Sequence, residues 1–147
     1  MAAMTRNTAR KAIILVVEDD PSVRTWIQQI LHEHGFASVG VGDTQKALSV
    51  FDRDDVEVYL AIVDMILPGD AGLDLAAELA RRHPGLRILY ISGCVDSIAM
   101  EAIAWNSPEL VLLKPFSEES LLERVRWLIA KPAGMQSAPA GGVTKTA

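Results

Sequence analysis

The sequence has little cysteine, no long apolar run and no excess of positive charge. Its single cysteine, Cys94, excludes an internal disulfide framework and favours a reducing compartment. The longest apolar run, Ala12 to Val17, falls well short of the roughly 18 to 20 residues that span a bilayer. No apolar stretch follows the basic N-terminal residues closely enough to resemble a signal peptide. We therefore expect a cytoplasmic protein that does not insert into membranes.

The charge balance excludes a further class of partner. A formal net charge of −5 gives an average surface that repels nucleic-acid phosphates. We therefore expect no direct contact with nucleic acid. Apolar residues are plentiful, because they make up 50% of the 147-residue chain. That composition supports one ordinary domain with its own hydrophobic core.

Short apolar runs recur along the chain, and each is followed by a segment with helical spacing. The runs are Ala12–Val17, Ala37–Val41, Val58–Val63, Arg87–Ile91 and Leu110–Leu113. Continuous β-branched runs are typical of strands buried on both faces of a parallel sheet. The alternation predicts an α/β fold with a doubly wound parallel sheet. Residues 11–131 would form this domain, whereas residues 1–10 and 132–147 lack periodicity and are interpreted as disordered tails.

Capping residues support two of the predicted helices. Asp20 can cap a helix that Pro21 opens, and Gly35 is placed to end it. Ser117 can open the last helix. The apolar face of that last helix comprises Leu121, Leu122, Val125, Leu128 and Ile129. The fourth helix, at about residues 96–105, is predicted to be short, because the Asn-Ser-Pro sequence that follows ends it early.

Polar residues follow the apolar runs at the points where the strands should end. In a parallel sheet these ends share one edge, so the residues should converge on one cleft. They are Glu18, Asp19, Asp64, Ser92 and Lys114. The three carboxylates would repel each other in a partly dehydrated cleft unless a cation lay among them. Ligand sets made only of oxygen favour Mg²⁺, with Mn²⁺ able to substitute.

Four motifs occur in the order typical of a known family. They are residues 16–21 (VVEDDP), residues 64–68 (DMILP) followed by Gly72, the pair Ser92-Gly93, and residues 114–116 (KPF). On these motifs the chain resembles, from about Ala12 to Ala130, the receiver domains of two-component response regulators. The resemblance implies a flavodoxin-like fold with five helices and a five-stranded sheet of order 2-1-3-4-5.

The resemblance also implies a role for each matching residue. Asp64 would accept a phosphoryl group from the phosphohistidine of a sensor histidine kinase or a histidine phosphotransfer protein. The groups that would hold Mg²⁺ are Glu18, Asp19, Asp64 and the backbone carbonyl of Ile66. Ser92 and Lys114 would contact the phosphate. The chain would catalyse only its own phosphorylation and dephosphorylation, so it would be a regulator and not an enzyme acting on other substrates.

The resemblance further implies how the signal would leave the domain. Movement of Ser92 toward the phosphate would bias a two-state equilibrium of the loop that follows it. The residues after Ala130 are too few for an output domain, so we expect a stand-alone receiver that signals by contact with a downstream protein. A homodimer is compatible with this interpretation, and so is an origin within a longer hybrid kinase. The Lys114-Pro115 peptide is expected to be cis.

Three positions depart from the family pattern. Val111 stands where receivers commonly carry an aromatic switch residue, three positions before the lysine. Ile66 and Cys94 stand two positions beyond Asp64 and Ser92, at places that tune the lifetime of the phosphate in this family. Because neither side chain can activate a hydrolytic water, we expect slow self-dephosphorylation.

Three other functions compete with a phosphorylation switch. A flavin or nucleotide module would need a glycine-rich phosphate loop after the first strand, where this chain has acidic residues. A haloacid-dehalogenase-like hydrolase would need a second acid two positions after Asp64, where Ile66 stands. The strongest alternative is a receiver-like docking module that binds a partner without being phosphorylated. Val111 and the unusual fourth helix favour it, whereas the complete set of site residues opposes it.

Overall fold

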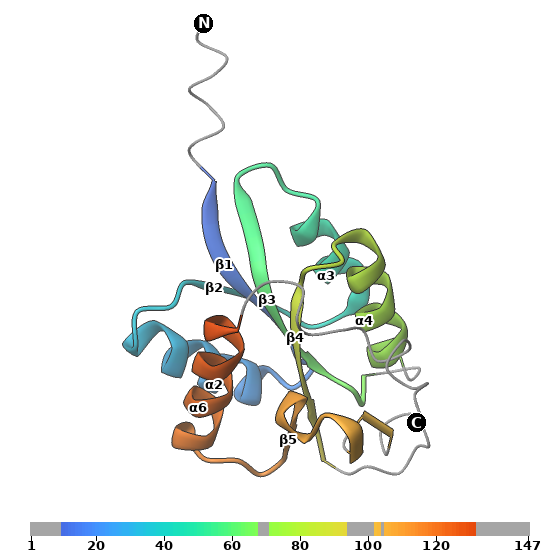
Figure 1. The fold of residues 1–147 in the computed structure, drawn as a ribbon. Coiled ribbons are helices and arrows are strands. Elements are labelled where there is room, and N and C mark those ends of the chain that lie inside the picture. Colours follow the sequence, from blue (N-terminus) through green and yellow to red (C-terminus); the bar gives the residue numbers. More distant parts are fainter. Residues whose placement is uncertain (1–9, 68–70, 94–101, 104, 132–147) are drawn as a thin grey trace, which may run out of the picture.

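Five parallel strands form one sheet in the computed structural model (Figure 1), which describes residues 10–67, 71–93, 102–103 and 105–131. The strand order is β2-β1-β3-β4-β5. The strands are β1 (Lys11–Val17), β2 (Ser38–Val41), β3 (Val56–Asp64), β4 (Arg87–Ser92) and β5 (Val111–Leu113). This is the expected order 2-1-3-4-5, so the fold class and the strand order are both confirmed.

Helices cover both faces of the sheet. The α-helices in the described part of the chain are α2 (Pro21–Glu33), α3 (Thr44–Phe51), α4 (Ala71–Arg82) and α6 (Glu118–Ala130). Helices α2 and α6 lie on one face, and α3 and α4 lie on the other (Figure 1). This arrangement confirms the doubly wound architecture. None of these helices is long and apolar enough to cross a membrane.

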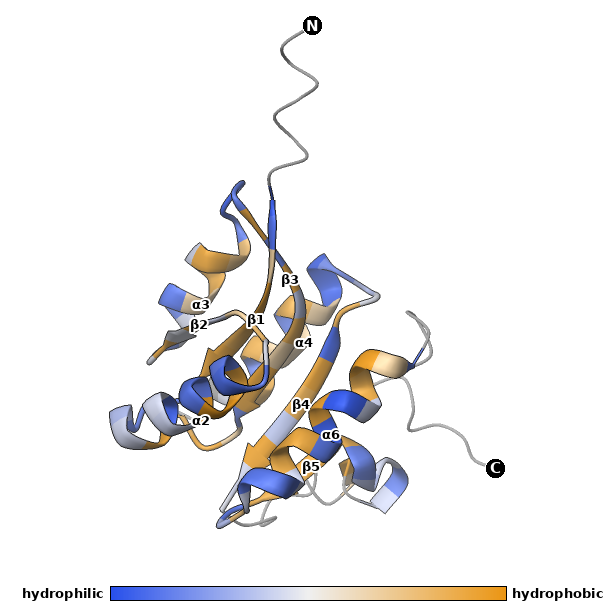
Figure 2. Ribbon diagram, turned by 90° about the vertical axis from the view of Figure 1, so that its left-hand side faces the viewer, coloured by the Kyte–Doolittle hydropathy of each residue, from blue (hydrophilic) through white to orange (hydrophobic). Residues whose placement is uncertain are grey.

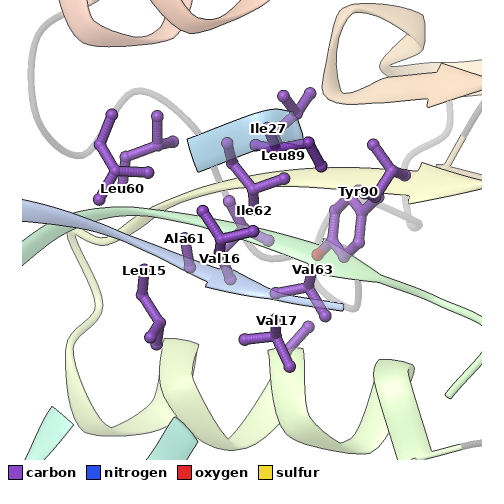
Figure 3. Close-up of a cluster of buried hydrophobic side chains, with 14 of the residues drawn as sticks. Leu15, Val16, Val17, Ile27, Leu60, Ala61, Ile62, Val63, Leu89 and Tyr90 are labelled. Atoms are coloured by element: carbon purple, nitrogen blue, oxygen red, sulfur yellow. The ribbon is translucent and has the colours of Figure 1, made fainter. Parts of the chain in front are cut away.

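The sheet carries most of the hydrophobic core, and its residues alternate between the two faces. Figure 3 shows Leu15 and Val17 pointing toward α4, whereas Leu60 and Ile62 point to the opposite face, where Ile27 of α2 lies. All five side chains are fully buried. In Figure 2 the strands are predominantly hydrophobic and the outer side of α2 is hydrophilic. The continuous apolar runs of the sequence are thus explained by burial on both sides.

The predicted helix caps are present. The Asp20 carboxylate accepts hydrogen bonds from the backbone N–H groups of Ser22 (2.9 Å) and Val23 (3.4 Å), and Pro21 is the first helical residue. Gly35 follows α2 with a positive φ of 87°, which glycine adopts without strain. The Ser117 hydroxyl accepts from the Ser120 N–H at the start of α6. The apolar face predicted for α6 packs on the core.

The last strand begins one residue later than predicted. Leu110 belongs to a short 3₁₀-helix, Pro108–Leu110, in which its N–H donates to the Ser107 carbonyl at 2.9 Å. Proline opens this turn, because its fixed φ suits a helical start. Strand β5 is therefore only three residues long. The guanidinium of Arg124 on α6 donates to the backbone carbonyls of Pro108, Glu109 and Val111 along this segment.

Some predictions fall on residues that the structure does not describe. The tails at residues 1–9 and 132–147 are among them, and so is most of the predicted fourth helix. Of that helix, residues 102, 103 and 105 are described and are helical, and residue 106, just beyond the predicted end, is helical as well. The Asn106 side chain donates to the Ala102 carbonyl at 2.9 Å, close to the predicted end of the helix.

A matched pair of leucine substitutions tests the two-sided core. Leu89 of β4 is fully buried, whereas Leu113 of β5 is 50% exposed. Leu89→Ala should lower the free energy of unfolding by about 3 kcal/mol, because it removes buried methyl groups and leaves a cavity. Leu113→Ala should cost less than about 1 kcal/mol. Urea denaturation of both variants measures the difference, and equal losses would contradict the assigned burial.

Candidate functional site

The register of the strands brings the predicted site residues to one edge of the sheet. Val17 of β1 is the Cα partner of Val63 of β3, so the next residues, Glu18 and Asp64, are neighbours. Asp64 is in turn paired with Ile91 of β4, and Ser92 follows Ile91. Ser92 is paired with Leu113, the residue before Lys114. The sequence therefore places its acids and its lysine beside one another at the switch point of the strand order.

Lys114 bridges two buried carboxylates. Its Nζ donates a hydrogen bond to Asp64 Oδ2 at 3.1 Å and lies 3.0 Å from Glu18 Oε1. The residues Glu18 and Asp64 are 0% and 2% exposed. The Lys114 peptide to Pro115 is cis, as expected from the family resemblance. The contact joins the ends of β1, β3 and β5 through a single ammonium group.

Burial dominates the protonation of Glu18. Desolvation raises the pKa of its carboxyl, and the neighbouring Asp64 raises it further. The contact with Lys114 and the hydrogen bond from the Asp20 N–H (3.1 Å to Oε2) lower this pKa without cancelling the effect of burial. Glu18 is therefore a carboxylate whose charge is only partly compensated by the protein.

Lys114 responds in the opposite sense to the same surroundings. Its partial burial lowers the pKa of the ammonium, but the contacts with Glu18 and Asp64 together outweigh burial, so the pKa is raised above its ordinary value. Lys114 thus stays positively charged at neutral pH. A lysine held charged beside two acids can contact further anionic oxygens that enter the site.

The acidic residues form a group that could hold a metal ion. Oxygen atoms of Glu18, Asp19 and Asp64 all lie within 4.8 Å of one another, and Asp19 is exposed whereas the other two are buried. Glu18 Oε1 is buried, and the Lys114 ammonium that lies 3.0 Å from it also contacts Asp64. Three carboxylates against one ammonium leave negative charge that a hard divalent cation would offset. The residues present therefore fit Mg²⁺.

The loop after β3 fixes the orientation of Asp64. Its Oδ1 accepts a hydrogen bond from the Ile66 N–H at 2.9 Å, while Oδ2 faces Lys114. The Ile66 side chain is 51% exposed. Ser92 is fully buried at the end of β4, on the strand next to Asp64. Cys94 lies outside the described residues.

Two residues contribute to the site without having been assigned a role from the sequence. Arg24 of α2 donates through Nη1 to the backbone carbonyl of Glu18 at 2.8 Å. Gly72 in the first turn of α4 lies so close to the loop after β3 that a Cβ there would meet the Asp64 carbonyl oxygen at 2.6 Å and the Met65 Cα at 2.6 Å. Arg24 follows the Asp20 cap by one helical turn, and Gly72 belongs to the motif that begins at Asp64, but neither pattern predicts these contacts.

The fold and the site define an open α/β protein with an acidic cluster at the switch point of its sheet. The family model described as "Response regulator receiver domain" matches residues 14–126. This match covers more than half of the chain, so the chain belongs to the response regulator receiver domain family of two-component systems.

Curated relatives place the receiver within longer proteins. Nodulation protein W of Bradyrhizobium diazoefficiens is 36% identical over 116 residues, which are 78% of this chain and 50% of that protein. The DNA-binding response regulator MtrA of Mycolicibacterium smegmatis is 30% identical over 113 residues, 77% of this chain and 48% of that protein. The chain thus spans about half the length of these relatives.

A solved structure supports the same fold. The response regulator protein TrrA from Thermotoga maritima, solved in complex with Mg²⁺-BeF, superposes with a TM-score of 0.66. The two sequences are 25% identical, and the superposition covers 80% of this chain and 98% of that one. The Mg²⁺-BeF ligand is a feature of the Thermotoga structure.

Substitution of Gly72 tests the close approach of α4 to the Asp64 loop. Gly72→Ala should lower the free energy of unfolding by about 2 kcal/mol, because backbone atoms must move to admit the methyl group. Gly85→Ala is the control, since a Cβ there would meet only His83 Cε1, at 3.9 Å. Thermal denaturation compares the two variants. Equal melting temperatures of the two variants would show that α4 does not pack closely against the backbone of Asp64 and Met65.

Proposed function

We propose that the chain is a phosphorylation-dependent signalling switch that accepts a phosphoryl group on Asp64. The donor is the phosphohistidine of a sensor histidine kinase or of a histidine phosphotransfer protein. The observation that carries the proposal is the contact of Lys114 with both Asp64 and Glu18, next to the exposed carboxylate of Asp19. This arrangement combines a nucleophilic carboxylate, a fixed positive charge and oxygen ligands for a cation, which are the parts that phosphoryl transfer requires.

The chain's own groups divide the work of the transfer. An Asp64 carboxylate oxygen forms the new O–P bond while the N–P bond of the phosphohistidine breaks, and the departing ring nitrogen keeps the electron pair. The Ile66 N–H holds the Asp64 carboxylate in place through Oδ1. Lys114 offsets the negative charge of the incoming phosphoryl oxygens. The Ser92 hydroxyl donates a hydrogen bond to one of these oxygens.

Mg²⁺ is the cofactor that fits the site, and Mn²⁺ can substitute. The groups that would hold it are the carboxylates of Glu18, Asp19 and Asp64 and the backbone carbonyl of Ile66. When bound, the cation supplies charge neutralisation between the nucleophile and the transferring oxygens. The buried Oε1 of Glu18 supports this assignment, because the Lys114 ammonium beside it is shared with Asp64 and offsets only part of the negative charge.

The proposed signal leaves the domain by protein contact. Residues 11–131 act as the receiver unit between tails at residues 1–10 and 132–147. The downstream target is a protein that responds to Ser92 and the residues after it, and a second copy of the chain is an additional candidate partner. Neither nucleic acid nor a membrane takes part directly in this proposal.

Phosphorylation by a small donor tests the central assignment. The chain is incubated with acetyl phosphate and Mg²⁺, and its intact mass is measured. The native chain should gain one phosphoryl group, and Asp64→Asn should gain none, because its amide cannot form an acyl phosphate. Asp43→Asn serves as the control, since Asp43 caps α3 through the Lys46 N–H and is not one of the site residues. No adduct on the native chain would instead favour the docking module that binds without phosphorylation.

The lifetime of the phosphoryl group provides a second test. We expect a half-life of minutes or longer in Mg²⁺ buffer, because the Ile66 side chain carries no group that could activate a water beside Asp64. The phosphorylated chain is freed of acetyl phosphate, and the adduct is followed by intact mass over time. A half-life of seconds would contradict this expectation without affecting the assignment of Asp64.

A further inference from the structure

Arg24 connects α2 to the turn that carries the acidic pair. It closes the first turn of α2, where its N–H donates to the Asp20 carbonyl at 2.9 Å, and its Nη1 donates to the Glu18 carbonyl at 2.8 Å. Glu18 is fully buried, so this carbonyl needs a partner inside the protein. The proposed function assigns no task to Arg24.

The neighbouring strand leaves room for the arginine. A Cβ at Gly42 would come within 3.0 Å of Arg24 Nη1, and a Cβ at Gly40 would come within 3.0 Å of Arg24 Cγ. Gln28, one turn further along α2, lies over Gly40 in the same way and donates to the Ser38 hydroxyl at 3.4 Å. The absence of side chains at both glycines thus lets the arginine lie across β2 and reach the end of β1.

Arg24 completes the restraint of the Glu18 main chain. The Glu18 N–H donates to the Val41 carbonyl of β2 at 3.0 Å, and the Glu18 carbonyl accepts from Arg24. Within the same turn, the Asp20 N–H donates to Glu18 Oε2. Because Asp19 lies between these anchored groups, the direction of its carboxylate depends on the same turn.

We propose that Arg24 is a positioning residue for the acidic pair, and this inference rests on the proposed function. Its guanidinium binds a backbone carbonyl and leaves the carboxylate oxygens of Glu18 and Asp19 available to a cation. Lys114 acts differently, since it faces the carboxylate oxygens of Glu18 and Asp64 directly. Removal of a group that hydrogen-bonds to a metal-ligating residue and orients it typically weakens metal affinity by about 10- to 100-fold.

Calorimetric titration with Mg²⁺ alone tests the proposal on the full chain. Arg24→Ala should weaken Mg²⁺ affinity by about tenfold relative to the native chain. Gln28→Ala is the matched control, because Gln28 lies on the same helix against the same glycine strand but donates to Ser38. It should leave the affinity within about twofold of the native value, as expected for a residue that does not support a metal ligand.

Two further variants separate positioning from a general loss of stability. Gly42→Ala keeps the arginine but crowds its guanidinium, because the new Cβ would lie 3.0 Å from Nη1, so it should weaken Mg²⁺ binding in the same direction. Arg24→Lys keeps a donor for the carbonyl and should recover part of the affinity lost in Arg24→Ala. Amide hydrogen exchange gives a readout independent of the metal: the Asp20 N–H should lose protection in Arg24→Ala and keep it in Gln28→Ala.

The outcomes distinguish this inference from the proposed function. If the native chain takes up no Mg²⁺, the metal part of the proposed function is wrong and the role of Arg24 falls with it. If the native chain binds Mg²⁺ but Arg24→Ala and Gln28→Ala have equal affinities, only the positioning role is overturned. Unchanged protection of the Asp20 amide in Arg24→Ala would overturn it as well.

Discussion

The crowding of three carboxylates around one ammonium group is the constraint on which the rest of the site depends. Glu18 and Asp64 are buried at adjacent strand ends, and Asp19 stands beside them at the surface. Such a cluster lowers the stability of a fold unless something offsets its charge, and clusters of this kind occur preferentially at functional sites. Lys114 compensates only part of the charge. The remaining negative charge is what fits the site to a cation.

An apolar sheet supplies the rigidity that this crowding requires. The β1 and β3 residues immediately before the acids, Val17 and Val63, are fully buried and pair directly across the sheet. Close-packed interiors have low compressibility. Acids attached to the ends of such strands therefore keep their separation. The hydrogen bond from the Ile66 N–H then fixes one oxygen of Asp64. The geometry of the site therefore depends on the packing of the core. A substitution inside the sheet can shift the strand ends and, with them, the acids.

Much of this organisation could be predicted from the sequence, because it depends on local spacing. Apolar runs identified all five strands, and the cap at Asp20 fixed the start of α2. The polar residues after the runs were brought together as predicted. The start of β5 was harder to predict from the sequence, because Leu110 fits both a strand and the turn that Pro108 opens. Arg24 was missed, and Gly72 was noted only as part of the Asp64 motif without a structural role. Both roles depend on how closely a helix approaches another segment, and that distance leaves no periodic signal in the sequence.

The three carbonyl contacts of Arg124 affect whether the edge of the sheet can pair with a strand from another molecule. Strand β5 is the last strand of the sheet beyond β4, and such an edge can recruit a strand from another molecule. Here the arginine of α6 occupies the Val111 carbonyl that an incoming strand would seek, and the strand itself is very short. The helix therefore shields the open border of the sheet and opposes its growth by intermolecular β-pairing.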